Sequence, residues 1–466
     1  MAAAAPPPVT PRPIHLVGVG GAGMSGLARL AARAGYRVSG TDRDDGPALA
    51  ALRAEGVDAR AGHAADAVPA DVEAVVVSTA IPDDNPDVVE ARRRGVALLH
   101  RADLLAELMT RRRGLAVAGA HGKSTTSAML ALALGDASAC IGATTDAGAG
   151  TGASWGEGEW FVAEADESDR SLLRLAPEAA IVTNVDHDHH ASFATIESVE
   201  EVFRAFLAAL PPGGVYVAGP DERAWALVES APCPSIRVGP GGDLWVETRA
   251  TGPAVVGSDG DSAPLSLSVP GDHNRNNAAC ALALARWCGV PLGDAAARLA
   301  SFRGVGRRFE EGGSAGGVRI VDDYAHHPSE LRATLAAARE GHPGRIVAVF
   351  QPHLFSRTQA LSHELGAALA AADHAVVTEI YPAREDPIRG VSGRLVAEAV
   401  PTGTDVVFAP TLAAAAEAVV AVAREGDLVI TLGAGDVTTL GKELLARLGN
   451  ESGHGANDRE QRPTTP

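Results

Sequence analysis

Short apolar runs alternate with amphipathic, Ala- and Leu-rich stretches along most of the chain. The runs are nearly continuous in Val, Ile, Leu and Ala, as in residues 14–20, 72–81 and 114–119. Strands that are buried on both faces of a parallel sheet have this pattern, and the stretches between them have the length of crossover helices. The alternation therefore predicts an α/β protein built on parallel sheets.

The alternation falls into three tandem blocks, two of which open on a strand and a glycine loop. We expect an N-terminal Rossmann-like domain, a central P-loop domain that contains a Gly- and Pro-rich β excursion near residues 212–270, and a Rossmann-like C-terminal domain. The expected boundaries are a disordered tail at 1–13, domains at 14–110, 111–308 and 309–450, and a disordered tail at 451–466.

Composition narrows the class of protein. The 466 residues are 46% hydrophobic and carry a net charge of −18, which suits a globular protein and argues against a nucleic-acid partner. No apolar run reaches about 18 residues, so we expect no membrane span. The four cysteines show no CxxC pair, which favours a reducing cytoplasm. The sequence leaves open whether the protein is a monomer or a homo-oligomer.

The first glycine loop lies between an expected strand and an expected helix. Glycines there let a diphosphate approach the amides at the helix N-terminus, and an acidic residue at the end of the next strand often binds a ribose. Taken alone, this arrangement suggests an NAD-dependent oxidoreductase, although a plain glycine turn would have the same pattern. The residues concerned are Gly18, Gly20, Gly21, Gly23 and Asp42.

The second glycine loop contains one of only two lysines among 40 basic residues. Where arginine has replaced nearly every lysine, a retained lysine indicates a role that arginine cannot fill. Backbone amides of such a loop can surround phosphates, the lysine can neutralise them, and a following Ser can bind Mg²⁺. The residues that form this predicted ATP site are Gly119, Ala120, His121, Gly122, Lys123, Ser124 and Thr125.

Carboxylates follow the next strand-like run, in the string AEADESD. Glu164, Asp166, Glu167 and Asp169 are candidate magnesium ligands because oxygen ligands suit that ion. A second cluster, TNVDHDHH at 183–190, also ends a strand. It lacks the cysteine or second cluster that a tetrahedral zinc site needs, so its residues alone leave its role unassigned.

The third block places Asp, Tyr, His and Arg at the ends of two strands, in DDYAHHP and QPHLFSRT. Arginines there can clamp a carboxylate or a phosphate. Arg307 and Arg308 lie close to the second expected domain boundary, where they could bridge two domains. Each arginine taken singly is more simply a solvated surface residue.

Taken together, these motifs resemble the Mur ligases, the ATP-dependent family that builds the cytoplasmic precursor of peptidoglycan. The resemblance spans residues 14 to about 437, and its motifs occur in the family's order. They are GVGGAGMSG, GAHGKSTT, AEADESD, TNVDHDH, PGDHNRNNA, GVGRRFE, DDYAHHP, QPHLFSRT, YPAREDPI and GAGD. The resemblance implies three domains, for a UDP-sugar, for ATP with Mg²⁺, and for the amino acid and closure.

Within the family, the motifs favour the branch that joins L-alanine to the lactyl carboxylate of UDP-N-acetylmuramate through an acyl phosphate. A relative that recycles a tripeptide onto the same sugar remains the alternative. The resemblance implies that the first loop binds the UDP-sugar diphosphate rather than NAD. It also implies that Lys123 and Ser124 serve ATP and Mg²⁺, with Glu167 on one magnesium and His189 on a second.

The remaining implied roles fall on two segments. His273, Asn274 and Asn277 are expected near the adenine. Lys123, His189 and His326 are the expected catalytic residues, the histidines as candidate bases. In the closing domain, the residues expected to face ATP and the substrates, or to lie at the domain boundary, are Arg307, Asp323, Tyr324, His353 and Arg357.

The chain departs from the usual family pattern at two places. Ala120 stands where the family usually has Thr, and DHDHHA replaces EPDHLD. No lysine occurs between Lys123 and Lys442, so the carbamylated lysine of relatives that add later amino acids is impossible here. Its absence fits the alanine-adding branch.

Overall fold

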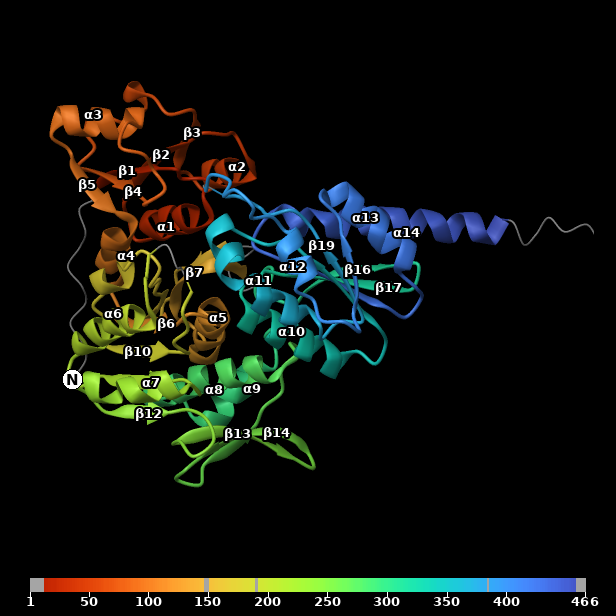
Figure 1. Cartoon of the computed structure of the whole chain (residues 1–466). Coiled ribbons are helices and arrows are strands. Elements are labelled where there is room, and N and C mark those ends of the chain that lie inside the picture. The colour runs from red at the N-terminus through yellow and green to blue at the C-terminus, as the bar shows by residue number, and fades with distance from the viewer. Residues whose placement is uncertain (1–11, 146–150, 189–191, 384, 458–466) are drawn as a thin grey trace, which may run out of the picture. The chain divides into compact units, whose positions relative to one another are not determined.

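A computed structural model of the protein describes residues 12–145, 151–188, 192–383 and 385–457. The chain folds into two compact units (Figure 1). The first runs to His187 and continues through Ser192–Ser268 and Arg275–Val305. The second begins at Gly306 and also contains Asp188 and Val269–Asn274. The first unit holds two of the three expected α/β sheets.

The N-terminal sheet has five strands in the order β3-β2-β1-β4-β5, and all its pairings are parallel. The order reverses at β1, so the loop after β1 lies at the switch point where α/β sheets bind ligands. The strands are β1 (Pro13–Val17), β2 (Arg37–Asp42), β3 (Asp58–Ala61), β4 (Ala74–Val77) and β5 (Ala97–His100). The helices are α1 (Ala22–Arg33), α2 (Pro47–Ala54), η1 (Ala65–Ala67), α3 (Pro86–Arg94) and α4 (Arg101–Met109).

The central sheet has seven strands in the order β12-β11-β10-β6-β9-β7-β8, and β7 pairs antiparallel with β8. The strands are β6 (Arg113–Ala118), β7 (Ser138–Thr145), β8 (Thr151–Ser154), β9 (Trp160–Glu164), β10 (Ala179–Val182), β11 (Val215–Ala218) and β12 (Ser235–Arg237). The helices are α5 (Lys123–Leu134), η3 (Ser171–Arg174), α6 (Ile196–Ala208), α7 (Glu222–Ala226), η4 (Leu227–Ser230), α8 (Asp272–Trp287) and α9 (Leu292–Leu299). Strand β6 lies between β10 and β9, so three loops converge beyond its carboxyl end.

The Gly- and Pro-rich stretch forms the expected β excursion. Strands β13 (Leu244–Arg249), β14 (Gly252–Gly257) and β15 (Ser262–Pro264) make a three-stranded antiparallel sheet. Along β13 the exposure of the side chains increases from buried Leu244 to exposed Arg249.

The C-terminal sheet has six strands in the order β16-β17-β21-β18-β19-β20, antiparallel only between β16 and β17. The strands are β16 (Glu310–Ala315), β17 (Val318–Asp323), β18 (Ile346–Phe350), β19 (His374–Val377), β20 (Asp405–Phe408) and β21 (Leu428–Leu432). The helices are α10 (Pro328–Gly341), α11 (Phe355–Leu369), α12 (Arg394–Glu398), α13 (Leu412–Val422), η5 (Asp436–Thr439) and α14 (Leu440–Asn457).

Helix α14 extends further than the sequence suggests. It continues to Asn457, so residues 451–457, which the sequence assigns to a disordered tail, are helical. Leu440 and Leu444 anchor the helix in an apolar cluster, and once a helix has begun each added residue gains one backbone hydrogen bond. The exact domain boundaries stay predictions.

The first unit has one continuous apolar core that crosses from the N-terminal sheet to the central sheet. Leu27 of α1 and Leu108 of α4 belong to the same buried cluster as Phe161 of β9. The C-terminal unit has two buried clusters of its own, one of which contains Leu331 and the other Val349. Among the described helices, none is long and apolar enough to cross a membrane.

Candidate active site

The first glycine loop connects β1 to α1 and bonds back to the end of β2. The amides of Gly18 and Val19 donate to the Thr41 carbonyl at 2.8 and 2.9 Å, and Gly20 N donates to Asp42 Oδ2 at 2.8 Å. Gly21 is the N-cap of α1 and makes no side-chain cap hydrogen bond, so the first amides of the helix can bind an anion. Asp42 thus supports the loop itself. Its contact with a ribose remains a prediction.

A buried carboxylate, which the sequence analysis did not single out, lies beneath this loop. Asp87, fully buried at the start of α3, accepts hydrogen bonds from the Thr41 hydroxyl and, at 2.9 Å, from Ala64 N. His63 Nδ1 lies 3.3 Å and His15 Nε2 3.5 Å from Asp87 Oδ2. Burial raises the pKa of Asp87, but these hydrogen bonds outweigh burial and leave it below its ordinary value. Asp87 is therefore ionised and fixes the same Thr41 whose carbonyl holds the loop.

The second glycine loop connects β6 to α5 and leaves no room for side chains at two positions. A Cβ on Gly119 would lie 2.1 Å from Thr183 Oγ1, and a Cβ on Gly122 would lie 2.6 Å from Asn277 Oδ1. Gly122 also has φ of +81° and serves as the N-cap of α5, with no side-chain cap hydrogen bond. The loop therefore exposes amides to a phosphate in the way a P-loop does.

Hydrogen bonds fix the position of the Lys123 amine at this loop. Its Nζ donates to the Gly119 carbonyl at 2.6 Å, to the Ala120 carbonyl at 3.0 Å and to both Glu167 carboxylate oxygens at 3.0 Å. Burial lowers the pKa of Lys123, but the neighbouring carboxylates more than offset this and raise it above its ordinary value. Burial raises the pKa of Glu167 to about 7. Lys123 is therefore a protonated cation next to the carboxylate predicted to bind magnesium.

The rest of the loop is held by the end of β10. His121 N donates to Asn184 Oδ1 at 2.9 Å, and His121 Nε2 lies 3.2 Å from Asp186 Oδ2. Ser124 and Thr125 are buried in the first turn of α5. Strand β10 pairs with β6, which explains why the TNVD segment lies beside the P-loop although His121 and Asn184 are 63 positions apart in sequence.

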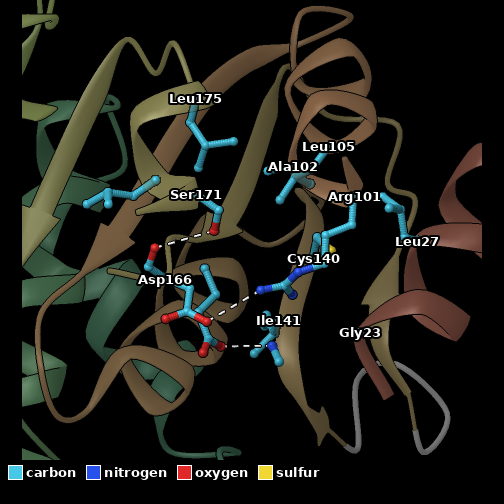
Figure 2. Close-up of a pocket in the computed structure, with 13 residues that line it drawn as sticks. Gly23, Leu27, Arg101, Ala102, Leu105, Cys140, Ile141, Asp166, Ser171 and Leu175 are labelled. Atoms are coloured by element: carbon cyan, nitrogen blue, oxygen red, sulfur yellow. Dashed lines mark hydrogen bonds and ion pairs between the residues drawn. The ribbon is translucent and has the colours of Figure 1, made fainter. Parts of the chain in front are cut away.

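The acidic string follows β9 and lines a pocket together with residues of helices α1 and α4. The cavity has a volume of about 260 Å³ and includes Gly23, Arg101, Cys140, Glu164 and Asp166 in its lining (Figure 2). Glu164 accepts a hydrogen bond from Gly142 N at 2.8 Å, and Figure 2 shows Arg101 reaching toward Asp166. The pocket joins the α1 end of the first loop to the carboxylates beside Lys123.

Helix α8 brings one of the predicted adenine residues to the P-loop. Asn277 is buried beside Gly122, as the close approach of its amide shows. Asn274 belongs to the second unit and donates from Nδ2 to the Pro270 carbonyl at 2.7 Å, so it shapes the turn before the helix. His273 precedes it on the same helix. The contact of these residues with adenine stays a prediction.

The C-terminal unit gathers aromatic and basic side chains at the carboxyl ends of β17, β18 and β19. Tyr324, His326, His353 and Tyr381 form a row whose successive ring centroids are 5.2, 6.0 and 5.8 Å apart. Burial, reinforced by the nearby Arg357 guanidinium, lowers the pKa of His353 to about 4. His353 is therefore neutral near pH 7.

Arg357 and His326 both face Asp188 in this unit. Arg357, 4% exposed, donates from Nη2 to Asp188 Oδ1 at 2.6 Å and from Nε to the same oxygen at 3.2 Å. His326 Nε2 lies 3.8 Å from Asp188 Oδ2, and its Nδ1 lies 3.2 Å from Glu330 Oε2. His189, the other predicted base and second-magnesium ligand, lies outside the described residues.

Residues at the start of the C-terminal unit have unusual backbone conformations. Arg307 and Phe309 have φ of +59° and +53°. The strain is held in place because Arg307 Nη2 donates to the Gly433 carbonyl at 2.6 Å and Phe309 N donates to Asp323 Oδ2 at 2.7 Å. Asp323 is buried, and burial raises its pKa. Asp323 also accepts hydrogen bonds from Ala325 N and from the Thr334 hydroxyl, and its role toward substrates stays a prediction.

Comparison with known proteins shows which protein family has this arrangement of domains and loops. Sequence models match consecutively along the chain: the Mur ligase family catalytic domain at 13–113, the Mur ligase middle domain at 117–285 and the Mur ligase glutamate ligase domain at 307–435. The chain belongs to the Mur ligase family. The three-domain α/β fold predicted for this family is thereby confirmed.

Among the relatives of this Mur ligase, a UDP-N-acetylmuramate–L-alanine ligase of Streptomyces coelicolor is 46% identical over 449 residues, covering 93% of this chain and 97% of the relative. A UDP-N-acetylmuramate–L-alanine ligase of Rubrobacter xylanophilus is 45% identical, and the alignment covers 93% of this chain and all of the relative. The crystal structure of a UDP-N-acetylmuramate-alanine ligase from Thermotoga maritima aligns with a TM-score of 0.77 at 28% identity, covering 94% of this chain and 99% of that one. The crystal structure of a murein peptide ligase from Psychrobacter arcticus aligns with a TM-score of 0.70 at 25% identity, covering 94% of this chain and 99% of that one.

These matches do not favour an NAD-dependent oxidoreductase, the alternative suggested by the first glycine loop alone. That loop and Asp42 are a shared solution for binding a diphosphate, so they do not specify which nucleotide is bound. Two further residues of the site, Asp87 and Arg101, are not indicated by the sequence motifs. Asp87 follows the Asn-Pro pair that begins a helix, a weak sign of its position, whereas nothing separates Arg101 from the many other arginines of this chain.

Proposed function

We propose that this protein is an ATP-dependent ligase that joins L-alanine to the lactyl carboxylate of UDP-N-acetylmuramate, a step of peptidoglycan precursor synthesis. The observation that carries the proposal is the P-loop lysine: Lys123 Nζ lies 3.0 Å from both oxygens of Glu167, in the same unit as a second anion-binding glycine loop. One unit thus offers separate places for a nucleoside triphosphate and for a nucleotide sugar. The 46% identical relative carries the name of this activity.

The reaction begins with phosphoryl transfer. A lactyl carboxylate oxygen attacks the γ-phosphorus of ATP, the bond from that phosphorus to the β,γ-bridging oxygen breaks, and ADP leaves with the electron pair. Two anions must approach each other, and the protonated Lys123 amine reduces their repulsion and stabilises the charge on the equatorial oxygens. The amides of the second loop and of the first turn of α5 hold the phosphates in place.

The second step forms the amide. The neutral amine of L-alanine attacks the acyl carbon, the carbon–oxygen bond to phosphate breaks, inorganic phosphate leaves, and the nitrogen gives up a proton to a base. His326 is the described candidate for that base, because its two ring nitrogens face Glu330 and Asp188. His189 remains the other candidate. Water would hydrolyse the acyl phosphate, so the domains must exclude it.

The residues around Lys123 fit a magnesium ion. Glu167 offers a carboxylate, Ser124 a hydroxyl at the start of α5, and Asp166 a second carboxylate, which are the oxygen donors that Mg²⁺ prefers. The buried Glu167 carboxylate, whose pKa is about 7, gains from a second cation beside it. Bound there, the ion would neutralise phosphate charge in the first step.

The test measures phosphate release with UDP-N-acetylmuramate and ATP across a panel of L-alanine, glycine, L-serine and the tripeptide that murein peptide ligases take. We expect turnover to depend on L-alanine and on the sugar. Turnover with the tripeptide alone would assign the protein to the recycling branch, and sugar-independent turnover would refute the proposal. Monomer and homo-oligomer, and a cytoplasmic location, are compatible with the proposal.

Two variants, Lys123→Ala and Lys123→Arg, test the role of Lys123 in this reaction. Both should abolish phosphate release while UDP-sugar binding, measured by calorimetry, stays within twofold. Arginine keeps the charge, but its planar guanidinium is wider than the space between the Gly119 carbonyl and Glu167. Full turnover in the alanine variant would remove Lys123 from the mechanism.

A further inference from the structure

The pocket between the first glycine loop and the acidic string has an unbalanced set of charges. Within the described part of the chain, its lining contains two carboxylates, Glu164 and Asp166, and one cation, Arg101. The other lining residues are Ser171, glycines, Cys140 and apolar residues such as Leu27 and Leu172. Among the charged residues of the lining, Glu164 and Asp166 repel an anion that enters the pocket, and Arg101 attracts it.

Arg101 is placed between two functional elements. It is the first residue of α4, directly after β5, at the carboxyl edge of the N-terminal sheet where α/β sheets bind ligands. Its Nη1 lies 3.4 Å from where a Cβ on Gly23 would be, so it is close to the backbone of the first glycine loop's helix. Its Nη2 points the other way, to the acidic string (Figure 2).

The contacts of the guanidinium are long. Among the described residues, its polar partners are Asp166 Oδ2 at 3.4 Å and Asp169 Oδ2 at 3.6 Å, both reached through Nη2. Charge-assisted hydrogen bonds between arginine and carboxylate are normally about 2.7–2.9 Å and often use two N–H groups. Arg101, whose side chain is 32% exposed, therefore has donors left to bind a carboxylate at full strength.

We propose that Arg101 binds the lactyl carboxylate of the sugar substrate and orients it toward the γ-phosphate. This inference rests on the proposed function. A sugar whose diphosphate is bound at the first loop must direct its reacting carboxylate to Lys123, and the acidic string that lines this pocket continues to Glu167 at Lys123. A planar, always charged guanidinium matches a carboxylate and can hold it while the carboxylate's free oxygen attacks.

The decisive experiment compares two ligands by calorimetry in the absence of ATP. UDP-N-acetylmuramate carries the lactyl carboxylate, and UDP-N-acetylglucosamine is the same nucleotide sugar without it. We expect Arg101→Ala to weaken binding of the first by about 10-fold or more and to change binding of the second by less than twofold, because only the first has the charge that Arg101 binds. The KM for UDP-N-acetylmuramate should rise while the KM for ATP stays constant.

Arg174→Ala is the matched control. Arg174 on η3 pairs with Asp103 on α4 at 2.7 Å, so it links the same two parts of the first unit, but it does not line the pocket. We expect its removal to leave both affinities unchanged. An equal loss in Arg174→Ala would mean that Arg101 acts through packing between the sheets and would overturn the inference.

Two further outcomes are distinguishable. Equal weakening of both sugars by Arg101→Ala would place Arg101 on the diphosphate and overturn the carboxylate assignment, and so would no weakening of either. If Arg101→Ala does not fold, Arg101→Lys keeps a charge but not the two-pronged geometry and should still lose at least threefold for UDP-N-acetylmuramate alone. Failure of the wild-type protein to release phosphate with L-alanine would instead refute the proposed function.

Discussion

Asp87 shows how a single buried residue can control a loop that it does not touch. Its carboxylate accepts from the Thr41 hydroxyl, and the Thr41 carbonyl accepts from Gly18 N and Val19 N. His63 and His15 lie around the same carboxylate oxygen. The loop conformation that we propose for diphosphate binding therefore depends on an ionised group beneath it.

Asp87→Asn should weaken UDP-sugar binding. The amide keeps the shape but replaces an accepting oxygen with a donor that faces Thr41 or Ala64, which costs roughly 1–3 kcal/mol. If that cost falls on the loop, KM for the sugar rises about 5- to 150-fold with kcat and the KM for ATP unchanged. Steady-state kinetics with each substrate varied in turn will show whether the KM for the sugar changes while kcat and the KM for ATP do not.

The control for Asp87 is Asp427→Asn. Asp427 is also nearly buried and pairs with Arg345 at 3.0 Å, but it lies in the C-terminal unit before β21. It should lower stability comparably and leave KM for the sugar unchanged. A rise in sugar KM in both variants would mean that the effect of Asp87 is a general loss of stability.

His353 should make the stability of the protein depend on pH. Its pKa in the folded protein is about 4, whereas an unfolded histidine titrates near 6.5, so the unfolded chain binds more protons between these values. Stability is therefore fully present above about pH 6.5 and is lost as pH falls toward 4, by at most about 3 kcal/mol. Urea unfolding at pH 5 and pH 7 should show a smaller difference in His353→Gln than in the wild type; identical pH dependence would contradict the assignment.

At the scale of elements, the two helices that follow glycine loops share one device. Both α1 and α5 have a glycine N-cap without a side-chain hydrogen bond, whereas α3, α6 and α10 have N-caps whose side chains accept one. A side-chain cap would occupy the amides that an anion needs. Helix α2 begins on the same kind of cap, at Gly46, so an uncapped helix start permits anion binding without indicating it.

Gly122→Ala tests the second loop against a glycine of equal backbone strain. Gly122 and Gly241 both have φ of +81°, but a Cβ at 122 would lie 2.6 Å from Asn277 Oδ1 and a Cβ at 241 would meet nothing within 4 Å. Each alanine costs about 1–2 kcal/mol of backbone strain. Only Gly122→Ala should also weaken ATP binding, by about 10-fold or more, as titration with a non-hydrolysable ATP analogue can measure. Equal ATP affinity in the two variants would argue against the P-loop assignment.

At the scale of the whole molecule, one apolar cluster spans the first two sequence blocks, although a smaller cluster that contains Val17 and Val75 lies within the first block. One cluster joins the N-terminal and central sheets through residues such as Leu27 and Phe161, while the C-terminal unit has its own clusters. We therefore expect the N-terminal and central domains to unfold together and the C-terminal unit to unfold in a transition of its own.

Leu104→Ala should reveal that division. Leu104, fully buried in α4, belongs to the shared cluster, and its truncation should cost about 2–5 kcal/mol. Amide hydrogen exchange should rise in both β4 and β9 and remain unchanged in β18. Protection lost in β4 alone would mean that the two sheets unfold independently.

The sequence predicted the α/β class, the two glycine loops and the acidic string because each is encoded locally. Apolar runs define strands, glycines define tight turns, and the rarity of lysine marked Lys123. The sequence does not predict the last turns of helix α14. Its polar end has no periodic apolar pattern beyond the buried Leu440 and Leu444. Arg101 and Asp87 were missed because one arginine among many, or one aspartate near a helix start, has no local pattern that indicates burial or a partner.

What the sequence determined by itself is the set of local elements and the family, because strand periodicity, loop glycines and motif order lie in neighbouring residues. Only the tertiary structure decided which of those elements meet. Parallel pairing of β6 with β9 and β10 brought Lys123 to Glu167 and the TNVD segment, and a shared core brought Arg101 to the acidic string. Such encounters depend on strand order and packing between distant segments, which no local pattern of residues encodes.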